Sequence, residues 1–133
     1  DELTGERVGA LGFRAYRARG AGDGLPWLML AGKLAQTVPG QWLSGQRPAH
    51  PAGGADSFLT LRELAAQGCG LAILPAFLGD EDGRLERVPS LMPDLSVDLW
   101  VASHADLAEV PRIARIRQCL AEAIRAEAAR LAG

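Results

Sequence analysis

The segment from Asp56 to Pro75 combines residue types whose order suits the recognition of a small ligand by backbone groups. It contains, in turn, a polar helix cap, an amphipathic helix, a glycine reversal, a short apolar strand and a proline. The start of a helix presents amide groups without intrahelical partners. In open α/β sheets, ligands bind beyond the carboxyl ends of the strands, where such amides converge. The segment therefore predicts binding of a small molecule at one edge of a sheet.

The elements that position these groups follow from local rules. Asp56 is predicted to cap the helix, because its carboxylate accepts hydrogen bonds from first-turn amides and complements the helix dipole. Gly68 is predicted to end that helix in the left-handed conformation that residues with a Cβ avoid. The apolar run from Leu71 to Leu74 predicts a strand buried on both faces of a parallel sheet. Pro75 is predicted to end that strand, because it cannot donate to the ladder.

Further strands and turns are expected on both sides of this segment. Alternating or apolar runs predict strands over residues 8–16, 27–30, 85–88 and 97–103. One helical turn is predicted at residues 34–38, a loop over residues 40–55 with a short strand at 47–50, and turns at 79–83 and 90–96. Strands that alternate with helices indicate an α/β fold.

The last third of the chain predicts an amphipathic helix. The helix begins at Pro111, or at a capping box formed by Asp106 and Glu109. Its apolar residues recur at steps of three or four and are Ile113, Ile116, Leu120, Ile124, Ala128 and Leu131. Burial of each large aliphatic side chain contributes on the order of 1.5–3 kcal/mol. We therefore expect upstream residues, a second chain or rearranged packing to cover this stripe, and the isolated chain to self-associate.

Composition narrows the classes of function. The 133 residues suit one domain, and 48% hydrophobic with 23% charged residues is typical of a globular protein. A net charge of −2 argues against binding of a phosphate backbone by this chain alone. Cys69 and Cys119 have no CxxC partner and His50 and His104 stand alone, so no metal site is predicted. We find no signal peptide or membrane span, and we expect the natural protein to extend upstream of the first residue.

Several segments together resemble the effector-binding domain of LysR-type transcriptional regulators. They are Leu11–Tyr16, Asp56–Pro75, Pro75–Asp80 with the following Arg84–Val88, and Leu99–Leu107. The resemblance implies an α/β fold of the periplasmic-binding-protein-like (type 2) class. It places residues 1–103 in the second lobe with its crossover strands, and residues 104–133 in the C-terminal helix that returns to the first lobe.

The resemblance also implies partners for the complete protein. A cytoplasmic homo-oligomer would bind a small-molecule effector between its lobes, and would bind DNA only through an N-terminal winged helix-turn-helix that is missing from this chain. No cofactor, no metal, no membrane partner and no catalytic residue or enzymatic activity are expected. One departure from the family pattern is Arg17–Leu25, a glycine-rich loop where the family usually has a helix.

By the same resemblance, the effector-binding residues lie at two loops and one strand. They are Asp56, Ser57, Phe58, Pro75, Ala76, Phe77 and Tyr16. Ser57 would donate to a ligand oxygen, whereas the carboxylate of Asp56 disfavours an anion and favours an amine-bearing or neutral effector. Structural roles are the alternatives: Asp56 and Ser57 as plain caps, Phe77 as a core residue, and Tyr16 as a structural hydroxyl.

Two other functions compete with the regulator. A solute-binding protein of a transport system has the same fold but requires export. A small α/β enzyme such as a hydrolase requires a nucleophile with a base and an orienting acid, and the chain has no nucleophile-elbow motif. The sequence upstream of this chain separates the first two, because a basic helix-turn-helix supports the regulator and a signal peptide supports the solute-binding protein.

Overall fold

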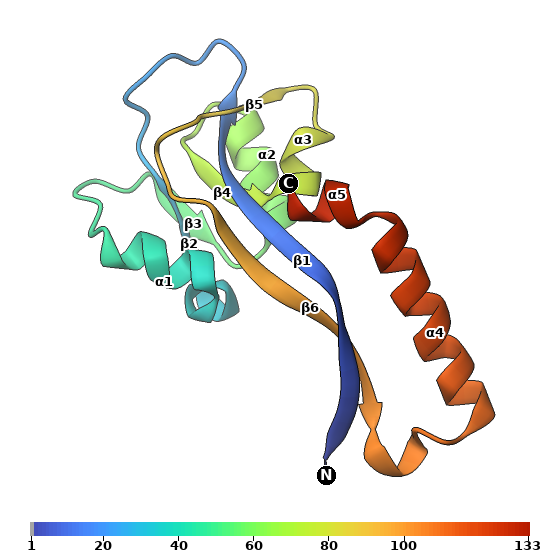
Figure 1. Cartoon of the computed structure of the whole chain (residues 1–133). Helices are drawn as coiled ribbons and strands as arrows, with labels where there is room; N and C mark the ends of the chain where they lie inside the picture. The colour runs from blue at the N-terminus through green and yellow to red at the C-terminus, as the bar shows by residue number, and fades with distance from the viewer. Residues whose placement is uncertain (1) are drawn as a thin grey trace.

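A single long strand organises the computed structural model, which describes residues 2–133. Strand β1 (Leu3–Ala18) has 16 residues and pairs antiparallel with three other strands. β6 (Leu95–His104) lies along its first part, and β4 (Ala72–Pro75) and β5 (Leu85–Arg87) lie along its last part. Figure 1 shows β1 and β6 side by side, extending well beyond the helices that surround the other strands.

The sheet continues from β4 to two shorter strands. β2 (Leu28–Leu30) pairs in parallel with β3 (Gly53–Ala55), and a parallel bridge between Trp27 and Leu71 joins this pair to the start of β4. The larger sheet therefore has the order β4, β1, β5, with β6 also paired to β1, and the β2–β3 sheet is joined to it through that bridge. The predicted parallel setting of the strand at Leu71–Leu74 is wrong, because β4 pairs antiparallel with β1 and the parallel contact is the single bridge from Leu71 to Trp27.

Helices follow the strand ends of this mixed sheet. They are η1 (Gly32–Gln36), α1 (Val38–Gly45), α2 (Phe58–Ala66) and α3 (Ala76–Asp80). α2 packs against β4, and α3 packs against β1 and β5. The largest fully buried side chains, each less than 2% exposed, are those of Tyr16, Leu28, Pro39, Leu43, Leu61, Ile73 and Leu74. The main core therefore lies between the mixed sheet and these helices.

The loop predicted over residues 40–55 is wrong in its first part, which forms most of α1. The Thr37 hydroxyl accepts a hydrogen bond from Gly40 N (3.2 Å) at the helix start, and Leu43 is completely buried. Pro39 lies in the first turn, where its missing N–H has no intrahelical partner to lose. The strand predicted at residues 47–50 is absent, and β3 forms instead.

The two ends of α2 give one correction and one confirmation. Ser57, not Asp56, is the N-cap, because the Ser57 hydroxyl accepts from Thr60 N (3.5 Å) and its own backbone is extended. Asp56 is exposed, one residue before the cap. Gly68 has φ +85° just past the C-cap, as predicted. The helix start is therefore displaced by one residue along the sequence.

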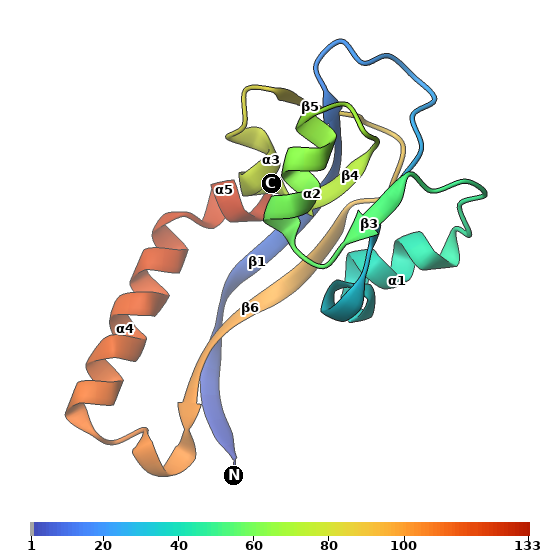
Figure 2. The ribbon, with the colours of Figure 1, turned by 180° about the vertical axis from the view of Figure 1, so that it is seen from behind.

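The chain ends in η2 (Ala105–Leu107), α4 (Pro111–Ala126) and α5 (Ala128–Ala132). The start at Pro111 is confirmed over the capping-box alternative. The helix is interrupted at Glu127, so that α5 turns toward α3, as Figure 2 shows from behind. Among residues 2–133, no helix is both long and apolar enough to cross a bilayer.

The stripe on α4 is only partly covered. Ala121 packs with Val8 of β1 and Val101 of β6 in a second, smaller core, whereas Ile116 and Leu120 are 53% and 51% exposed. An exposed apolar face therefore remains on α4 at Ile116 and Leu120.

Replacement of Gly79 by Ala tests the packing of α3 on β1. Alanine normally stabilises a helix relative to glycine by up to about 1 kcal/mol. A Cβ at Gly79 would overlap the ring of Tyr16, so we expect Gly79→Ala instead to lower the free energy of unfolding by about 1–3 kcal/mol. Gly83→Ala is the control, since a Cβ there meets open space, and should stay within about 0.5 kcal/mol of wild type. Equal urea midpoints for the two variants would contradict this packing.

Light scattering of the purified chain tests the exposed apolar face. We expect concentration-dependent self-association, because burial of exposed aliphatic surface is favourable by about 25 cal/mol per Å². The double variant Ile116→Gln, Leu120→Gln should shift the distribution toward monomer. Ala123→Gln, which adds an amide at another exposed position of α4, should not. A wild-type chain that stays monomeric at all concentrations contradicts the prediction.

Candidate functional site

The predicted ligand loops lie at the carboxyl ends of neighbouring strands. β2 leads into Gly32, β3 leads into Asp56, and β4 ends at Pro75. Because β3, β2 and the start of β4 are parallel, these ends face the same edge of the sheet. Gly32 has φ +56°, and a Cβ built on it would lie 3.0 Å from Asp56 Cβ. The structure therefore packs the Asp56 loop directly against the turn that follows β2.

Phe13 of β1 links the two predicted loops. Its ring centroid lies 5.9 Å from that of Phe58, and its backbone is opposite Pro75 in the β1–β4 pairing. Phe13 itself is 4% exposed. Phe58 and Pro75 thus approach the same buried ring from two elements. Phe13 was not among the predicted site residues, although the alternating pattern of residues 8–16 places it on an apolar face.

Tyr16 supports one of these loops from within the core. Its side chain is 1% exposed, its hydroxyl donates to Asp80 Oδ1 (2.8 Å), and it lies 3.1 Å from the carbonyl oxygen of Ala76. Burial, followed by the hydrogen bond to Asp80, raises the pKa of Tyr16. Tyr16 therefore remains a neutral phenol that fixes the start of α3, which matches the structural alternative considered for it.

An ion pair completes this support. Arg87 Nε donates to Asp80 Oδ1 (2.8 Å), and Arg87 Nη2 donates to Asp80 Oδ2. These hydrogen bonds, with that from Tyr16, hold the pKa of Asp80 below its usual value despite partial burial, and Asp80 in turn raises the pKa of Arg87. The two-point contact fixes the geometry of both side chains and ties the end of α3 to β5.

The C-terminal segment covers the Ala76–Phe77 side of the predicted site. Arg130 lies over the half-buried Phe77 ring, with Cζ 5.8 Å from the centroid, and donates to Glu81 Oε2 (3.1 Å). A Cβ built on Gly133 would lie 2.8 Å from Ala76 Cβ. Ala76 is fully buried. The Asp56–Phe58 side is more open, since Asp56 is exposed and Ser57 and Phe58 are half-buried.

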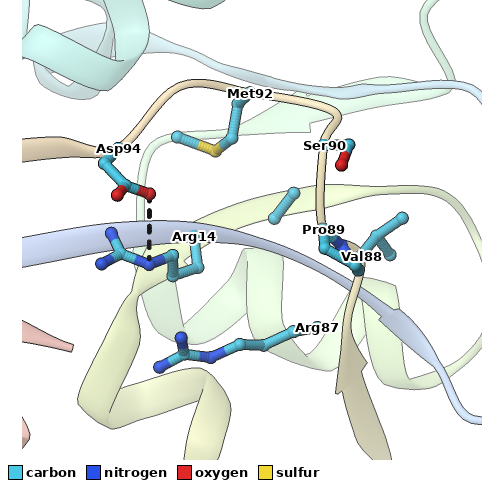
Figure 3. Close-up of a pocket in the computed structure, with 8 residues that line it drawn as sticks. Arg14, Arg87, Val88, Pro89, Ser90, Met92 and Asp94 are labelled. Carbon is cyan, nitrogen blue, oxygen red and sulfur yellow. Dashed lines mark ion pairs between the residues drawn. The ribbon is translucent and has the colours of Figure 1, made fainter.

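A separate cavity of about 210 Å³ opens where the loop of residues 88–94 leaves β5 before joining β6 (Figure 3). Its charged lining consists of Arg14 of β1, Arg87 of β5 and the exposed Asp94 of the loop, and Val88, Pro89 and Met92 form an apolar wall. None of the site residues predicted from the resemblance lines it. The signal that was available in the sequence is Arg14 itself, a charged residue in a strand otherwise rich in apolar and small residues.

Metal-binding and thiol groups are dispersed over the structure. Within residues 2–133, no three His, Cys, Asp or Glu side chains gather as metal ligands would. Cys69 and Cys119 are both free and exposed. The groups that converge at the strand ends are instead hydrogen-bonding and aromatic ones.

Comparison with known proteins relates this architecture to one family. The family model described as LysR substrate binding domain matches residues 23–125. No curated protein matches the chain. The regulatory domain of HypT from Salmonella typhimurium in its bromide-bound form superposes with a TM-score of 0.67 at 16% identity, over 95% of this chain and 66% of that one.

Two other solved structures are similar. The regulatory domain of CrgA, a LysR-type regulator from Neisseria meningitidis, has a TM-score of 0.70 at 21% identity, over 91% of this chain and 68% of that one. Full-length LysG from Corynebacterium glutamicum with bound effector Arg has a TM-score of 0.67 at 15% identity, over 91% and 46%. Our chain thus spans about two thirds of the isolated regulatory domains and less than half of the full-length regulator.

At these identities the solved structures show a shared fold, and they confirm the periplasmic-binding-protein-like α/β fold predicted from the sequence. The family match extends over most of the chain, from the glycine-rich loop after β1 into α4. It describes a domain of transcriptional regulators and not an enzyme family. The chain belongs to the family of LysR substrate-binding domains.

Proposed function

We propose that this chain forms the second lobe and the C-terminal return of the effector-sensing domain of a LysR-type transcriptional regulator. Residues 1–103 correspond to the second lobe with its crossover strands, and residues 104–133 to the return helix. The observation that carries the proposal is the convergence of the Ser57 and Pro75 loops at one sheet edge, beside the β1–β6 pair. A ligand that contacts this edge and the first lobe would change the orientation of one lobe relative to the other along that pair of strands.

The charge at this edge favours a neutral or amine-bearing effector. Asp56 is exposed next to Ser57, and its carboxylate offsets part of the attraction that the α2 amides exert on an anion. HypT is known with bromide and LysG with Arg, ligands of opposite charge on the same fold. The fold therefore does not set the charge of the ligand, and the local residues must do so. Ser57 and Phe58 are the most accessible of the predicted contacts.

The remaining contacts are proposed in a narrower role. Pro75, Ala76 and Phe77 shape the floor of the site, because Pro75 and Ala76 are buried and Phe77 is covered by Arg130. Tyr16 positions that floor through its hydrogen bonds to α3. The structure thus supports direct ligand contact at Ser57 and Phe58 and indirect support at Tyr16.

The complete regulator would act in the cytoplasm as a non-enzymatic homo-oligomer that binds DNA through an N-terminal winged helix-turn-helix. The net charge of −2 supports the proposal that a part of the regulator outside this chain contacts DNA. The family match favours this reading over a solute-binding protein of a transport system, which has the same fold.

A thermal-shift screen of amine-bearing and neutral metabolites on the full-length regulator tests the proposal. We expect a saturable rise in melting temperature with a specific compound, because a ligand that binds only the folded state stabilises it. Ser57→Ala should weaken the binding of that compound by about 3- to 10-fold, because it removes one hydrogen bond of about 0.5–1.5 kcal/mol.

Thr37→Ala is the matched control, because Thr37 also caps a helix, α1, but is not among the proposed contacts. Both variants lose a cap and should be destabilised by about 0.5–2 kcal/mol. Only Ser57→Ala should bind the stabilising compound more weakly. Equal dissociation constants for the two variants would show that the Ser57 hydroxyl does not contact the effector.

A further inference from the structure

We propose that the cavity between β1 and the loop of residues 88–94 binds a small carboxylate with a short apolar body, anchored by Arg14 and supported by Arg87. The site lies apart from the Ser57 loop and uses different residues. It goes beyond the effector site proposed above and does not depend on it.

Arg14 provides a fixed positive charge whose ion pair with Asp94 is long. Its side chain is only 21% exposed, and Nη1 donates to the carbonyl oxygen of Phe13 (2.8 Å). The nearest carboxylate is Asp94, whose Oδ1 is 4.0 Å from Arg14 Nε and whose side chain is 92% exposed. That distance exceeds the 2.7–3.2 Å typical of a hydrogen bond. Among residues 2–133, Phe13 is the one hydrogen-bond acceptor that Arg14 has, although a guanidinium carries five N–H donors.

Arg87 is held in place beside this charge. The two-point ion pair with Asp80 fixes its guanidinium, and the Gly133 carbonyl oxygen lies 3.3 Å and 3.4 Å from its two Nη atoms. Asp80 neutralises most of the Arg87 charge, so Arg87 orients a bound carboxylate more than it attracts one. Figure 3 shows Arg14 and Arg87 extending in the same direction below the loop, from neighbouring strands. A carboxylate at Arg14 would therefore meet donors from a preformed wall.

The opposite wall selects for an apolar body. Val88, Pro89 and Met92 line it, and Val88 N donates to Ala15 O (2.9 Å), which fixes the loop to β1 at this point. Methionine adapts its shape to a ligand at low cost. The volume of about 210 Å³ lies below the ~300–1,000 Å³ of sites for drug-sized ligands. A short-chain carboxylate uses both walls, whereas inorganic phosphate would leave the apolar wall without a contact.

The two sites of the chain would then differ in charge preference. The Ser57 loop carries the exposed carboxylate of Asp56, whereas the cavity carries the Arg14 guanidinium. Arg14 belongs to β1 one residue after Phe13, which pairs with both Pro75 and Leu95. A carboxylate bound there would contact the strand at the point where β6 leaves it.

Titration of the ¹⁵N-labelled chain with butyrate, at constant ionic strength and neutral pH, tests the proposal. We expect saturable shifts of the Arg14 Nε–H resonance and of the backbone amides of Val88 and Met92. Arg14→Gln should raise the dissociation constant of butyrate at least about tenfold, because charge-assisted hydrogen bonds contribute about 1.5–3 kcal/mol. Arg7→Gln is the control: Arg7 lies on the same strand, but its Nε already donates to Asp98 (2.7 Å).

Several outcomes would overturn the site. Equal butyrate affinity in Arg14→Gln and Arg7→Gln would do so, as would shifts that never saturate. Inorganic phosphate binding as tightly as butyrate would overturn the role of the apolar wall. If Arg14→Gln does not fold by circular dichroism, Arg14→Lys replaces it, and an unchanged affinity there counts against the guanidinium anchor. Ser57→Ala should bind butyrate normally, so failure at this cavity is distinguishable from failure of the effector site.

Discussion

The continuity of β1 is the constraint on which the rest of the structure depends. The strand uses both edges of its backbone around Phe13, where one edge meets Pro75 of β4 and the other meets Leu95 of β6. Its side chains alternate between two packed layers, with Phe13 against α2 and Tyr16 against α3. Any shift of register would move both side chains to the wrong face at once. The strand therefore fixes where both ligand loops stand relative to β6.

Polar contacts fix the starts of α3 and α2 at this edge of the sheet. The Tyr16 hydroxyl, Asp80 and Arg87 form a connected set that joins β1, α3 and β5. Because each member is satisfied, the set positions the start of α3 without leaving a buried polar group unpaired. On the other side of Phe13, the Ser57 cap and the turn at Gly32 set the start of α2. The residues that we propose to contact a ligand are thus different from those that support the structure.

The sequence predicted the parts of the fold that depend on local chemistry. Periodicity placed the main strands and α4, and Gly68 marked the end of α2 as a position with positive φ. The resemblance located the loops at the strand ends. It could not distinguish Asp56 from Ser57 as the cap, because both residue types favour that position and only the backbone geometry decides. α1 was missed because Gly40, read as the start of a loop, is compatible with the first turn of a helix.

Long-range packing accounts for the remaining differences. Tyr16 and Phe77 stay predicted site residues, but the contacts of Tyr16 with α3 and of Phe77 with Arg130 of α5 come from segments far along the chain. The cavity at Arg14 likewise requires the loop of residues 88–94 to fold back over β1. No local pattern encodes these approaches. Ile116 and Leu120 are exposed within this chain, so cover of the stripe by upstream residues or a second chain stays a prediction.

Native-state amide hydrogen exchange tests the central role of β1 most directly. We expect the amides of residues 13–16, which pair with β4 and at Phe13 and Tyr16 also with β6 or β5, to exchange more slowly than those of residues 3–7, which pair only with β6 and precede a register irregularity. Residues 72–74 of β4 should share the slow class. Exchange at residues 13–16 that is as fast as in the glycine-rich loop at residues 20–24 would contradict a strand that holds the structure together.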